Sequence, residues 1–360
     1  MQLQELLKTK DNNFKLIRML AACLVVYSHS FCLATGNEHS EPIAQYLGLS
    51  LGYIAVDIFF ITSGLLVCKS LLTARSLTIF VLSRCLRIYP ALITSVIFCC
   101  LLGLQLSKLS LGQYLSHNET QNFLIYNSSI IVGDYQMLPD VFTSAPYNRS
   151  VNGSLWTLPW ELKMYLILTG FGVTYQFARK LKVAVNWLPT VIVLTALICL
   201  MLFIHDQLSG REPHWFYSKF YRFASAFFIG GNLYVFRAWI GINYKGMLAA
   251  ILILLLAFFS LNQSLFFISY LIITPYLIMC FAYLPKGKIL HYNHLGDYSY
   301  GMYIYAWPIQ QLIATTIPKV TAIHMFVMAF CLTLLLAYCS WNYIEKPALA
   351  LKRHLYQPSS

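Results

Sequence analysis

The sequence predicts an all-α, polytopic integral membrane protein with about ten transmembrane helices and both termini in the cytoplasm. Three observations predict this fold class. First, 58% of the 360 residues are hydrophobic and only 11% are charged, whereas about a quarter of the residues of a soluble domain are charged. Second, ten apolar runs are each long enough to cross a ~30 Å bilayer core as a helix. Third, the lysine and arginine residues are concentrated in alternate polar segments between these apolar runs, as expected when one side of a membrane carries most of the positive charge.

The apolar runs indicate how the chain is organised. We expect one membrane domain over residues 1–360, with spans filling about 14–345, an external loop at about 107–153 and a short cytoplasmic tail. The first run is longer than the apolar core of a signal peptide, so we expect it to be retained. The ten expected spans are residues 14–34, 52–73, 87–106, 158–178, 187–205, 216–236, 246–262, 264–284, 298–317 and 321–344.

Lysine and arginine residues indicate the orientation. With the N-terminus in the cytoplasm, 18 of the 25 fall on the cytoplasmic side and 7 on the outer side, which is the positive-inside bias of membrane proteins. The net charge of +12 therefore reports orientation, and no nucleic-acid partner is expected. The seven outer residues are Lys108, Arg149, Lys163, Arg211, Lys219, Arg222 and Lys319.

The ten cysteines lie in or at the edges of apolar runs, and none forms a Cys-x-x-Cys pair. Such cysteines are typical of small packing residues. We therefore expect no disulfide framework, no redox motif and no metal.

The first span carries two ionisable residues, Arg18 and His29. Their spacing of eleven residues places them within ~20° of one helix face and ~16 Å apart along the axis. An ionisable group facing lipid costs several kcal/mol, so both side chains are expected to face a protein interior or a wet cavity. Two simpler alternatives are a snorkelling anchor for Arg18 and a hydrogen-bonded core residue for His29.

The second span begins with the run Gly52–Gly64, which contains Asp57 near its expected outer end. An aspartate beside a histidine stabilises the imidazolium and selects its tautomer. The alternative is a structural hydrogen bond from Asp57 to a neighbouring helix. Ser63 and Gly64 are expected to serve close helix packing.

The third span is preceded by Arg84 and Arg87 at its expected cytoplasmic entrance. Residues three apart share a helix face. Two guanidinium groups on one face suit phosphate groups, which they bind through forked hydrogen bonds. Anionic lipid head groups are an equally good alternative ligand.

The stretch Gly153–Tyr165 opens the fourth span. Thr157 and Pro159 are typical of a helix start. Glu161 then falls in the first turn, and Tyr165 lies one turn deeper on the same face. A carboxylate that enters the bilayer is costly unless it is paired or used, so Glu161 is a candidate functional residue near the expected depth of His29.

Taken together, these stretches resemble the acyltransferase-3 family of integral membrane acyltransferases, which O-acylate surface carbohydrates. The resemblance runs from Arg18 to Pro347. It rests on the Arg-x10-His pair Arg18 and His29, the run Gly52–Gly64, the Arg-x-x-Arg pair Arg84 and Arg87, the block Trp156–Tyr165, the Ser-Tyr-x-x-Tyr segment Ser299–Tyr303, and the closing Glu345-Lys346-Pro347.

The resemblance implies a ten-helix membrane fold that uses acetyl-CoA or another acyl-CoA as donor. Many members carry a histidine where this chain has Ala306, so no catalytic role transfers to that position. Some members also carry an added soluble transferase domain. This chain is expected to lack one, so its acceptor is expected to bind the membrane unit itself.

Roles for the candidate residues follow from the resemblance and from the expected depths. His29 is expected to act as general base, oriented by Asp57 or Glu161 near the outer side. The donor is expected to bind through Arg18, Arg84 and Arg87, and the acceptor through Trp156, Thr157 and Tyr165. Both direct transfer and a covalent acyl-enzyme route remain open.

The expected reaction moves an acetyl group from cytoplasmic acetyl-CoA to a sugar hydroxyl on the outer side. The acceptor class is a surface polysaccharide such as an O-antigen, an exopolysaccharide or a capsule. The protein is expected to lie in the bacterial cytoplasmic membrane, with membrane lipids as partners. The alternative function is a transporter or flippase of lipid-linked glycans, which would use the same buried charges as a substrate path.

Overall fold

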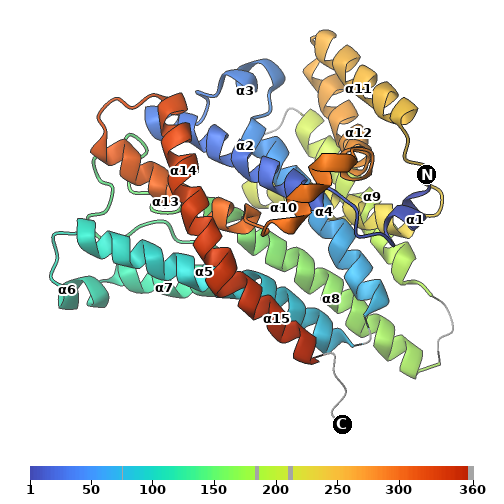
Figure 1. The fold of residues 1–360 in the computed structure, drawn as a ribbon, viewed down its shortest axis with the longest axis horizontal. Coiled ribbons are helices and arrows are strands. Elements are labelled where there is room, and N and C mark those ends of the chain that lie inside the picture. Colours follow the sequence, from blue (N-terminus) through green and yellow to red (C-terminus); the bar gives the residue numbers. More distant parts are fainter. Residues whose placement is uncertain (75, 183–185, 210–213, 356–360) are drawn as a thin grey trace. The chain divides into compact units, whose positions relative to one another are not determined.

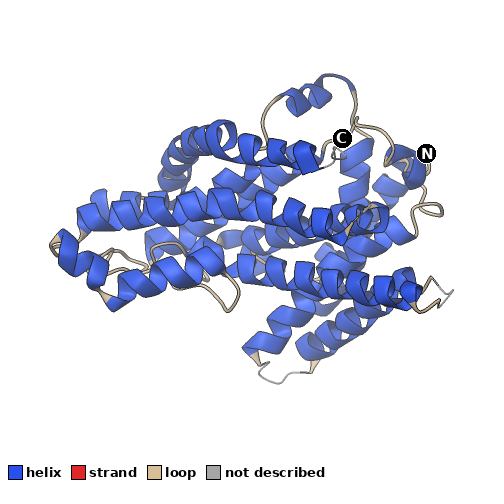
Figure 2. Cartoon of the chain, turned by 90° about the horizontal axis from the view of Figure 1, so that it is seen from below, coloured by secondary structure: helices blue, strands red, loops and turns tan. Residues whose placement is uncertain are grey.

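The computed structural model describes residues 1–74, 76–182, 186–209 and 214–355, with side chains up to residue 351. Within these ranges the protein is built of helices and loops, without strands (Figure 2). Four basic residues used in the charge count lie outside this description, namely Arg75, Arg211 and the side chains of Lys352 and Arg353. The predicted all-α membrane fold is confirmed.

Each of the ten expected spans coincides with one long helix (Figure 1). Six stretches of the described chain are long and apolar enough to cross a membrane: α2, α4, α5, α9, α12, and α14 with its continuation to Leu351. The number of crossings and the side of each terminus stay predictions. The ten helices are α2 (Phe14–Thr35), α4 (Leu51–Thr73), α5 (Leu77–Leu106), α8 (Leu158–Lys180), α9 (Leu188–Leu208), α10 (Trp215–Val235), α11 (Tyr244–Phe259), α12 (Gln263–Tyr283), α13 (Ser299–Thr316) and α14 (Ala322–Ser340).

One of these helices is longer than the sequence predicts, and another is continued by further helical elements. Helix α5 begins at Leu77 rather than at residue 87, because the residues between contain no helix breaker, so Arg84 and Arg87 lie within the helix. Helix α14 continues through a π-helical turn, η3 (Trp341–Glu345), into α15 (Lys346–Leu355). A π-turn shifts the angular position of the residues it contains, and such turns are frequent at functional sites.

The remaining elements are short. The predicted external loop is partly helical, since it contains α6 and α7, and the capping box of Ser110 and Gln113 begins α6. The short elements are α1 (Leu3–Leu6), α3 (Pro42–Leu47), α6 (Leu111–Ser116), α7 (Asn118–Ser129), η1 (Gly153–Thr157) and η2 (Gly287–His294).

The chain divides into two compact units. The first contains residues 1–18, 56–80 and 164–295, and the second contains residues 19–55, 81–163 and 296–360. Helices α2, α4, α5 and α8 each contribute residues to both units. The predicted single membrane domain therefore stays a prediction.

The core of the first unit depends on a close crossing of α4 and α10. A Cβ atom at Gly64 would lie 1.8 Å from the carbonyl oxygen of Phe227, and one at Gly230 would lie 2.0 Å from that of Ile61. Only glycine allows two backbones to approach so closely, as at many helix crossings in membranes. The predicted packing role of Gly64 is confirmed.

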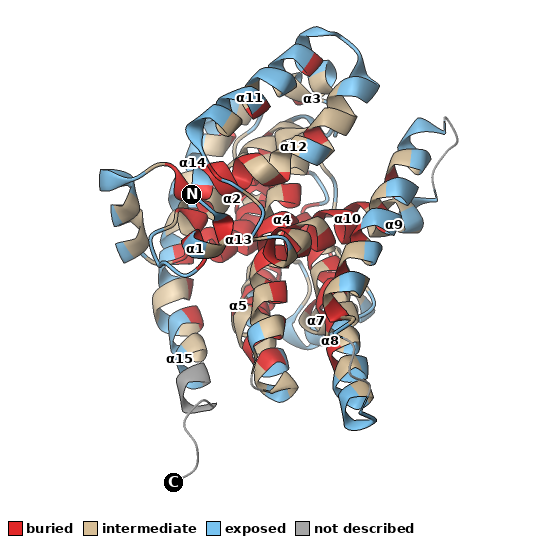
Figure 3. Cartoon of the chain, turned by 90° about the vertical axis from the view of Figure 1, so that its right-hand side faces the viewer, coloured by how far each residue is buried: buried red, intermediate tan, exposed pale blue. Residues whose placement is uncertain are grey.

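The core of the second unit is built around α13. Fifteen of its 18 residues are buried, whereas α11 in the first unit buries only Ala250 and Ala257 (Figure 3). A Cβ at Gly301 would lie 2.7 Å from the Cα of Ala337, so α13 packs directly on α14. A helix that is buried on all sides places every polar side chain it carries in the protein interior.

Candidate active site

His29 lies in the second unit, on α2, beside an aromatic residue of α13. The ring centroids of His29 and Trp307 are 4.7 Å apart and the ring planes meet at 77°, an edge-to-face contact. The Nδ1 atom of His29 is buried and has no hydrogen-bond partner among the described residues. The prediction that Asp57 or Glu161 orients this ring therefore stays a prediction. The contact that the structure shows for the ring is the one with Trp307.

The Trp307 ring is itself held in place from two sides. Its Nε1 donates a 3.1 Å hydrogen bond to the carbonyl oxygen of Ser150. Gly153 packs against its six-membered ring so closely that a Cβ there would lie 2.6 Å from Cζ2. Residues 150–153, which lead into η1, therefore fix the indole, and the indole in turn restricts the His29 ring.

Pro308 explains how this segment is anchored to α13. Proline has no N–H, so within a helix it leaves the carbonyl four residues earlier without its helical partner. That carbonyl belongs to Ile304, and it accepts hydrogen bonds from Asn152 Nδ2 at 2.8 Å and from Ser95 Oγ at 3.1 Å. A polar segment is thereby joined to a buried helix without an unpaired backbone group.

Thr157 takes part in a buried hydroxyl chain with α13. The Tyr303 hydroxyl donates to the carbonyl oxygen of Ser154 at 2.6 Å, and it lies 2.5 Å from the Thr157 hydroxyl. A phenol has a single proton, so Thr157 is the donor in the second hydrogen bond. Two stretches singled out by the sequence, Trp156–Tyr165 and Ser299–Tyr303, meet at this point.

The other predicted residues of this block have different surroundings. Glu161 lies in the first turn of α8, as predicted, and is half-buried. Trp156 is also half-buried. Tyr165 belongs to the first unit, where its buried hydroxyl lies 3.0 Å from Ser63 Oγ. Ser63 thus has a polar partner as well as a place in the helix packing.

Several buried polar atoms around α13 have no hydrogen-bond partner among the described residues. Buried polar groups are nearly always paired in native proteins, and the exceptions often belong to functional sites. The unpaired atoms here come from α2, from the residue before η1, from η1 itself, and from α13. They are His29 Nδ1, Asn152 Oδ1, Ser154 Oγ, Gln310 Oε1 and Gln311 Oε1.

Arg87 forms an ion-pair cluster with two carboxylates of the second unit. Its Nη2 lies 2.7 Å from Asp297 Oδ2, and its Nη1 lies 3.7 Å from Glu345 Oε2. Ser299 donates a 2.6 Å hydrogen bond to the other Asp297 oxygen, and Ser340 donates one of 3.1 Å to the other Glu345 oxygen. Three stretches that carry the family resemblance therefore meet here, and the charge of Arg87 is already balanced.

Arg84 differs from Arg87 although both lie on one face of α5. Its Nε and Nη2 atoms are each 3.4 Å from the Ser83 hydroxyl, and no carboxylate contacts it in the described part of the chain. Arg84 therefore keeps an uncompensated positive charge, which fits an anionic ligand better than Arg87 does. Arg18, in the first unit, is half-buried.

Asp57 lies in the first unit, where it forms a buried ion pair that the sequence did not reveal. Its Oδ1 accepts a hydrogen bond from Nε of Arg222 at 3.0 Å and lies 3.0 Å from Nη2 of the same guanidinium. Its Oδ2 accepts a hydrogen bond from the Tyr270 hydroxyl at 2.9 Å. Asp57 is thus bonded to two neighbouring helices, as the structural alternative expects, and its part in the reaction stays a prediction. Arg222 was counted as an outer charge, but it is 8% exposed and therefore carries little information on orientation.

A second carboxylate that sequence reasoning missed is Glu41, in the segment that joins α2 to α4. It is 2% exposed. Its oxygens accept hydrogen bonds from Ser28 Oγ at 2.5 Å and from the backbone N–H of Leu51 at 2.8 Å. Because Ser28 precedes His29, Glu41 ties α2 to the start of α4 beside the candidate base.

The fold and these buried polar groups define the class of protein: a polytopic membrane protein with ionisable side chains inside its helical core. A family model described as an acyltransferase domain, of the acyltransferase-3 type, matches residues 11–342 and thus includes residues of both units. The chain belongs to this family and is an integral membrane acyltransferase that transfers acyl groups other than aminoacyl groups.

Two relatives match nearly the full length. The chain is 31% identical over 354 residues to an O-acetyl transferase of Shigella phage Sf6, covering 94% of this chain and 96% of that protein. It is 28% identical over 370 residues to nodulation protein 10 of Rhizobium leguminosarum bv. viciae, covering 96% and 95%. No solved structure matches the chain.

Proposed function

We propose that this protein is an O-acetyltransferase of the bacterial cytoplasmic membrane. It transfers an acetyl group from acetyl-CoA to a sugar hydroxyl of a surface polysaccharide. The observation that carries the proposal is the His29 imidazole, whose buried Nδ1 has no hydrogen-bond partner among the residues that the structure describes and whose ring is held by Trp307. The full-length similarity to a phage protein named O-acetyl transferase supports the same reaction.

In the proposed reaction the acceptor hydroxyl oxygen attacks the carbonyl carbon of the acetyl thioester. His29 takes the hydroxyl proton as the C–O bond forms, and it returns a proton to the CoA sulfur as the C–S bond breaks. General base catalysis of this kind contributes about 10²- to 10⁴-fold to a rate. Glu161, in the first turn of α8, is the carboxylate that we assign to stabilising the imidazolium.

The proposed donor site uses Arg84 rather than Arg87 for the CoA phosphates. Arg84 has no carboxylate partner in the described part of the chain, whereas Arg87 faces Asp297 and Glu345. In the predicted orientation both arginines lie toward the cytoplasm and His29 lies in the outer half. The donor's extended pantetheine arm then has to bridge the two levels, since the bilayer core is ~30 Å thick.

The test is a thermal-shift and transfer assay on the purified full-length protein. CoA is expected to raise the melting temperature, because a ligand that binds only the folded state stabilises it. His29→Ala is expected to retain this stabilisation but to lose acetylation of the surface glycan, whereas His39→Ala, at an exposed histidine, is expected to retain both. Wild-type protein that CoA does not stabilise would favour the flippase, which has no use for an acyl donor.

Sidedness is tested separately in sealed vesicles of known orientation. Labelled acetyl-CoA is expected to be used only from the cytoplasmic face, while the acetylated sugar collects on the other face. Equal use of acetyl-CoA supplied at the outer face would contradict transfer across the membrane.

A further inference from the structure

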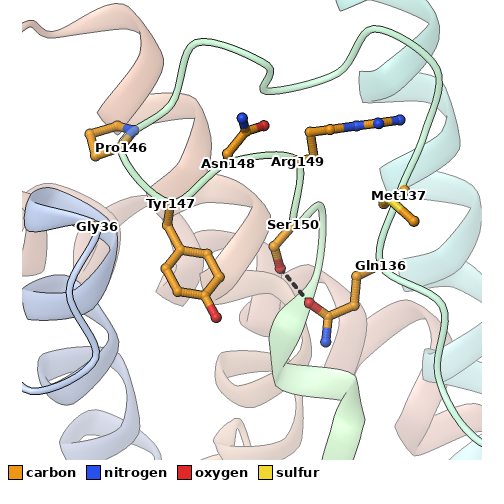
Figure 4. A pocket seen from close by; sticks show the side chains of 8 residues that line it. All are labelled: Gly36, Gln136, Met137, Pro146, Tyr147, Asn148, Arg149 and Ser150. Atoms are coloured by element: carbon orange, nitrogen blue, oxygen red, sulfur yellow. Dashed lines mark hydrogen bonds between the residues drawn. The ribbon is translucent and has the colours of Figure 1, made fainter.

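An open cavity of about 470 Å³ lies between the end of α2 and the external segment of the second unit. Its size falls within the ~300–1,000 Å³ range of small-molecule sites. Figure 4 shows the Tyr147 ring and the hydrogen-bonded pair of Ser150 and Gln136 on one side of the segment, with Asn148 and Arg149 on the other. The cavity is lined by Gly36, Gln136, Met137, Pro146, Tyr147, Asn148, Arg149 and Ser150.

The walls of this cavity are held rigidly. Gln311 of α13 donates hydrogen bonds to the carbonyl oxygens of Tyr147 at 2.7 Å and of Ser150 at 2.8 Å. Gly36, at φ +74°, lies so close to Pro146 that a Cβ would be 2.6 Å from its carbonyl oxygen. A cavity whose backbone is held in this way is preformed, so a ligand loses little free energy in ordering it.

The lining has the chemistry of a site for a polyol. Tyr147 supplies an aromatic surface, and Asn148, on the other side of the segment, supplies an amide with two donors and an acceptor. The Ser150 hydroxyl donates to Gln136 and keeps its capacity to accept. Small-molecule sites commonly combine apolar and aromatic surface with a few polar groups. A sugar ring presents the complementary pattern, with apolar C–H groups on its faces and hydroxyls around its edge.

The charges around the cavity select against an acidic ligand. Arg149 is the positive group of the lining, and its Nη2 lies 2.5 Å from Glu119 Oε1. Asp134 accepts a hydrogen bond from Gln136, and Glu38 accepts one of 2.7 Å from the Tyr147 hydroxyl. Burial and this carboxylate raise the pKa of the Tyr147 hydroxyl, so it remains a donor. Three carboxylates against one guanidinium disfavour a uronic acid and permit a neutral sugar.

One aromatic ring connects the cavity to the candidate base. The ring centroids of Tyr147 and Trp307 are 5.5 Å apart, and Trp307 contacts His29. We propose that the cavity binds a neutral sugar residue of the acceptor glycan and so determines which sugar is presented near His29. This assignment rests on the proposed function.

The test places a large side chain in the cavity and leaves the backbone contacts of Gln311 and Gly36 unchanged. Asn148 is exposed on the described surface, so Asn148→Trp is expected to fold normally while occupying the space of the sugar. Thr143→Trp makes the same change at an exposed position of the same segment outside the lining and is the matched control. The probes are neutral hexose and deoxyhexose oligosaccharides and a matched set that contains hexuronic acid.

Stabilisation by the probes is measured on the full-length protein, with and without CoA. A neutral oligosaccharide is expected to raise the melting temperature of the wild type and of Thr143→Trp. Asn148→Trp is expected to require at least about tenfold more of it, a loss of ~1.4 kcal/mol in binding, with an unchanged response to CoA. Equal responses of Asn148→Trp and the wild type would overturn the proposal, as would stabilisation by the acidic set alone or by no probe.

This readout separates the two proposals. If CoA does not raise the melting temperature of the wild type but the neutral oligosaccharide does, the result would contradict acetyl-CoA as donor while supporting the sugar site. A normal CoA response without any effect of Asn148→Trp would leave the transferase standing and remove the sugar site.

Discussion

The His29 imidazole lies edge-to-face against the Trp307 indole, with ring centroids 4.7 Å apart. The indole is held by the Ser150 carbonyl through its N–H and by Gly153 through close packing. An imidazole in such a contact has fewer accessible rotations, and catalysis by a general base depends on its orientation. Trp307 is therefore a positioning residue for the proposed base.

The first prediction concerns Trp307. Trp307→Phe keeps an aromatic neighbour but loses the hydrogen bond to Ser150, so the His29 ring is expected to be less well oriented. We expect kcat for acetyl transfer to fall by up to about 100-fold, with an unchanged thermal shift by CoA. Trp239→Phe, at a tryptophan that is 82% exposed, is the control. A fall confined to the melting temperature would mean that Trp307 is only a core residue.

The second prediction separates the two arginines of α5. Arg87→Gln removes the partner of two largely buried carboxylates, Asp297 and Glu345, so we expect the free energy of unfolding to fall by about 3–5 kcal/mol. No described carboxylate pairs with Arg84, so the stability of Arg84→Gln is expected to be unchanged while its thermal shift by CoA decreases. The reverse outcome would assign donor binding to Arg87.

A lysine substitution refines this second test. Arg84→Lys keeps the charge but loses the forked geometry that binds phosphate, so a partial recovery of the CoA response is expected. Full recovery would mean that charge alone matters at this position, as it does for lipid head groups. The measurement is the CoA concentration that gives half of the maximal thermal shift.

The third prediction concerns the buried pair of Asp57 and Arg222. Arg222→Gln leaves a carboxylate that is 3% exposed without its cation, so we expect a loss of about 3–5 kcal/mol in stability. Asp57→Asn combined with Arg222→Gln removes both charges and is expected to recover most of that loss. The double-mutant cycle measures the coupling between the two residues.

Activity of the double variant decides the role of Asp57. A stable and active double variant would confine Asp57 to structure. A stable but inactive one would restore the interpretation of Asp57 as a partner of His29.

The fourth prediction concerns the crossing of α4 and α10. Gly64→Ala would place a Cβ 1.8 Å from the Phe227 carbonyl oxygen, and a backbone atom cannot move away as a side chain can. We expect strongly reduced stability and yield in the membrane. Gly170→Ala, at a glycine of α8 with nothing within 4 Å of its added Cβ, is expected to be neutral or stabilising by about 0.5–1 kcal/mol. Normal yield of Gly64→Ala would contradict the close crossing.

Much of the architecture was predictable because it depends on local sequence. Runs of apolar residues predicted the ten long helices, since a backbone in lipid must satisfy its hydrogen bonds within the segment. Thr157 and Pro159 predicted the start of α8, and Gly64 predicted a close helix crossing. These signals act over a few neighbouring residues, so no knowledge of distant contacts was needed.

Two boundaries were not predictable from the same signals. Helix α5 begins ten residues before the expected span because hydropathy marks what the bilayer covers, whereas a helix continues until its hydrogen bonds are interrupted. The π-helical turn at Trp341–Glu345 has no local sequence signature of its own. It belongs to the segment that places Glu345 beside Arg87, and that partner lies on another helix.

The sequence by itself determined that this chain is a helical membrane protein of the acyltransferase-3 type. It also singled out His29 and Glu161 as groups too costly to leave facing lipid, Asp57 as a candidate partner of His29, and the α5 arginines as a candidate phosphate-binding pair. Only the tertiary structure decided their partners: Trp307 for His29, Arg222 and Tyr270 for Asp57, and two carboxylates for Arg87. The physical reason is that hydropathy and charge specify the depth of a residue along the membrane normal, whereas contacts also depend on how each helix is rotated and which helices are its neighbours.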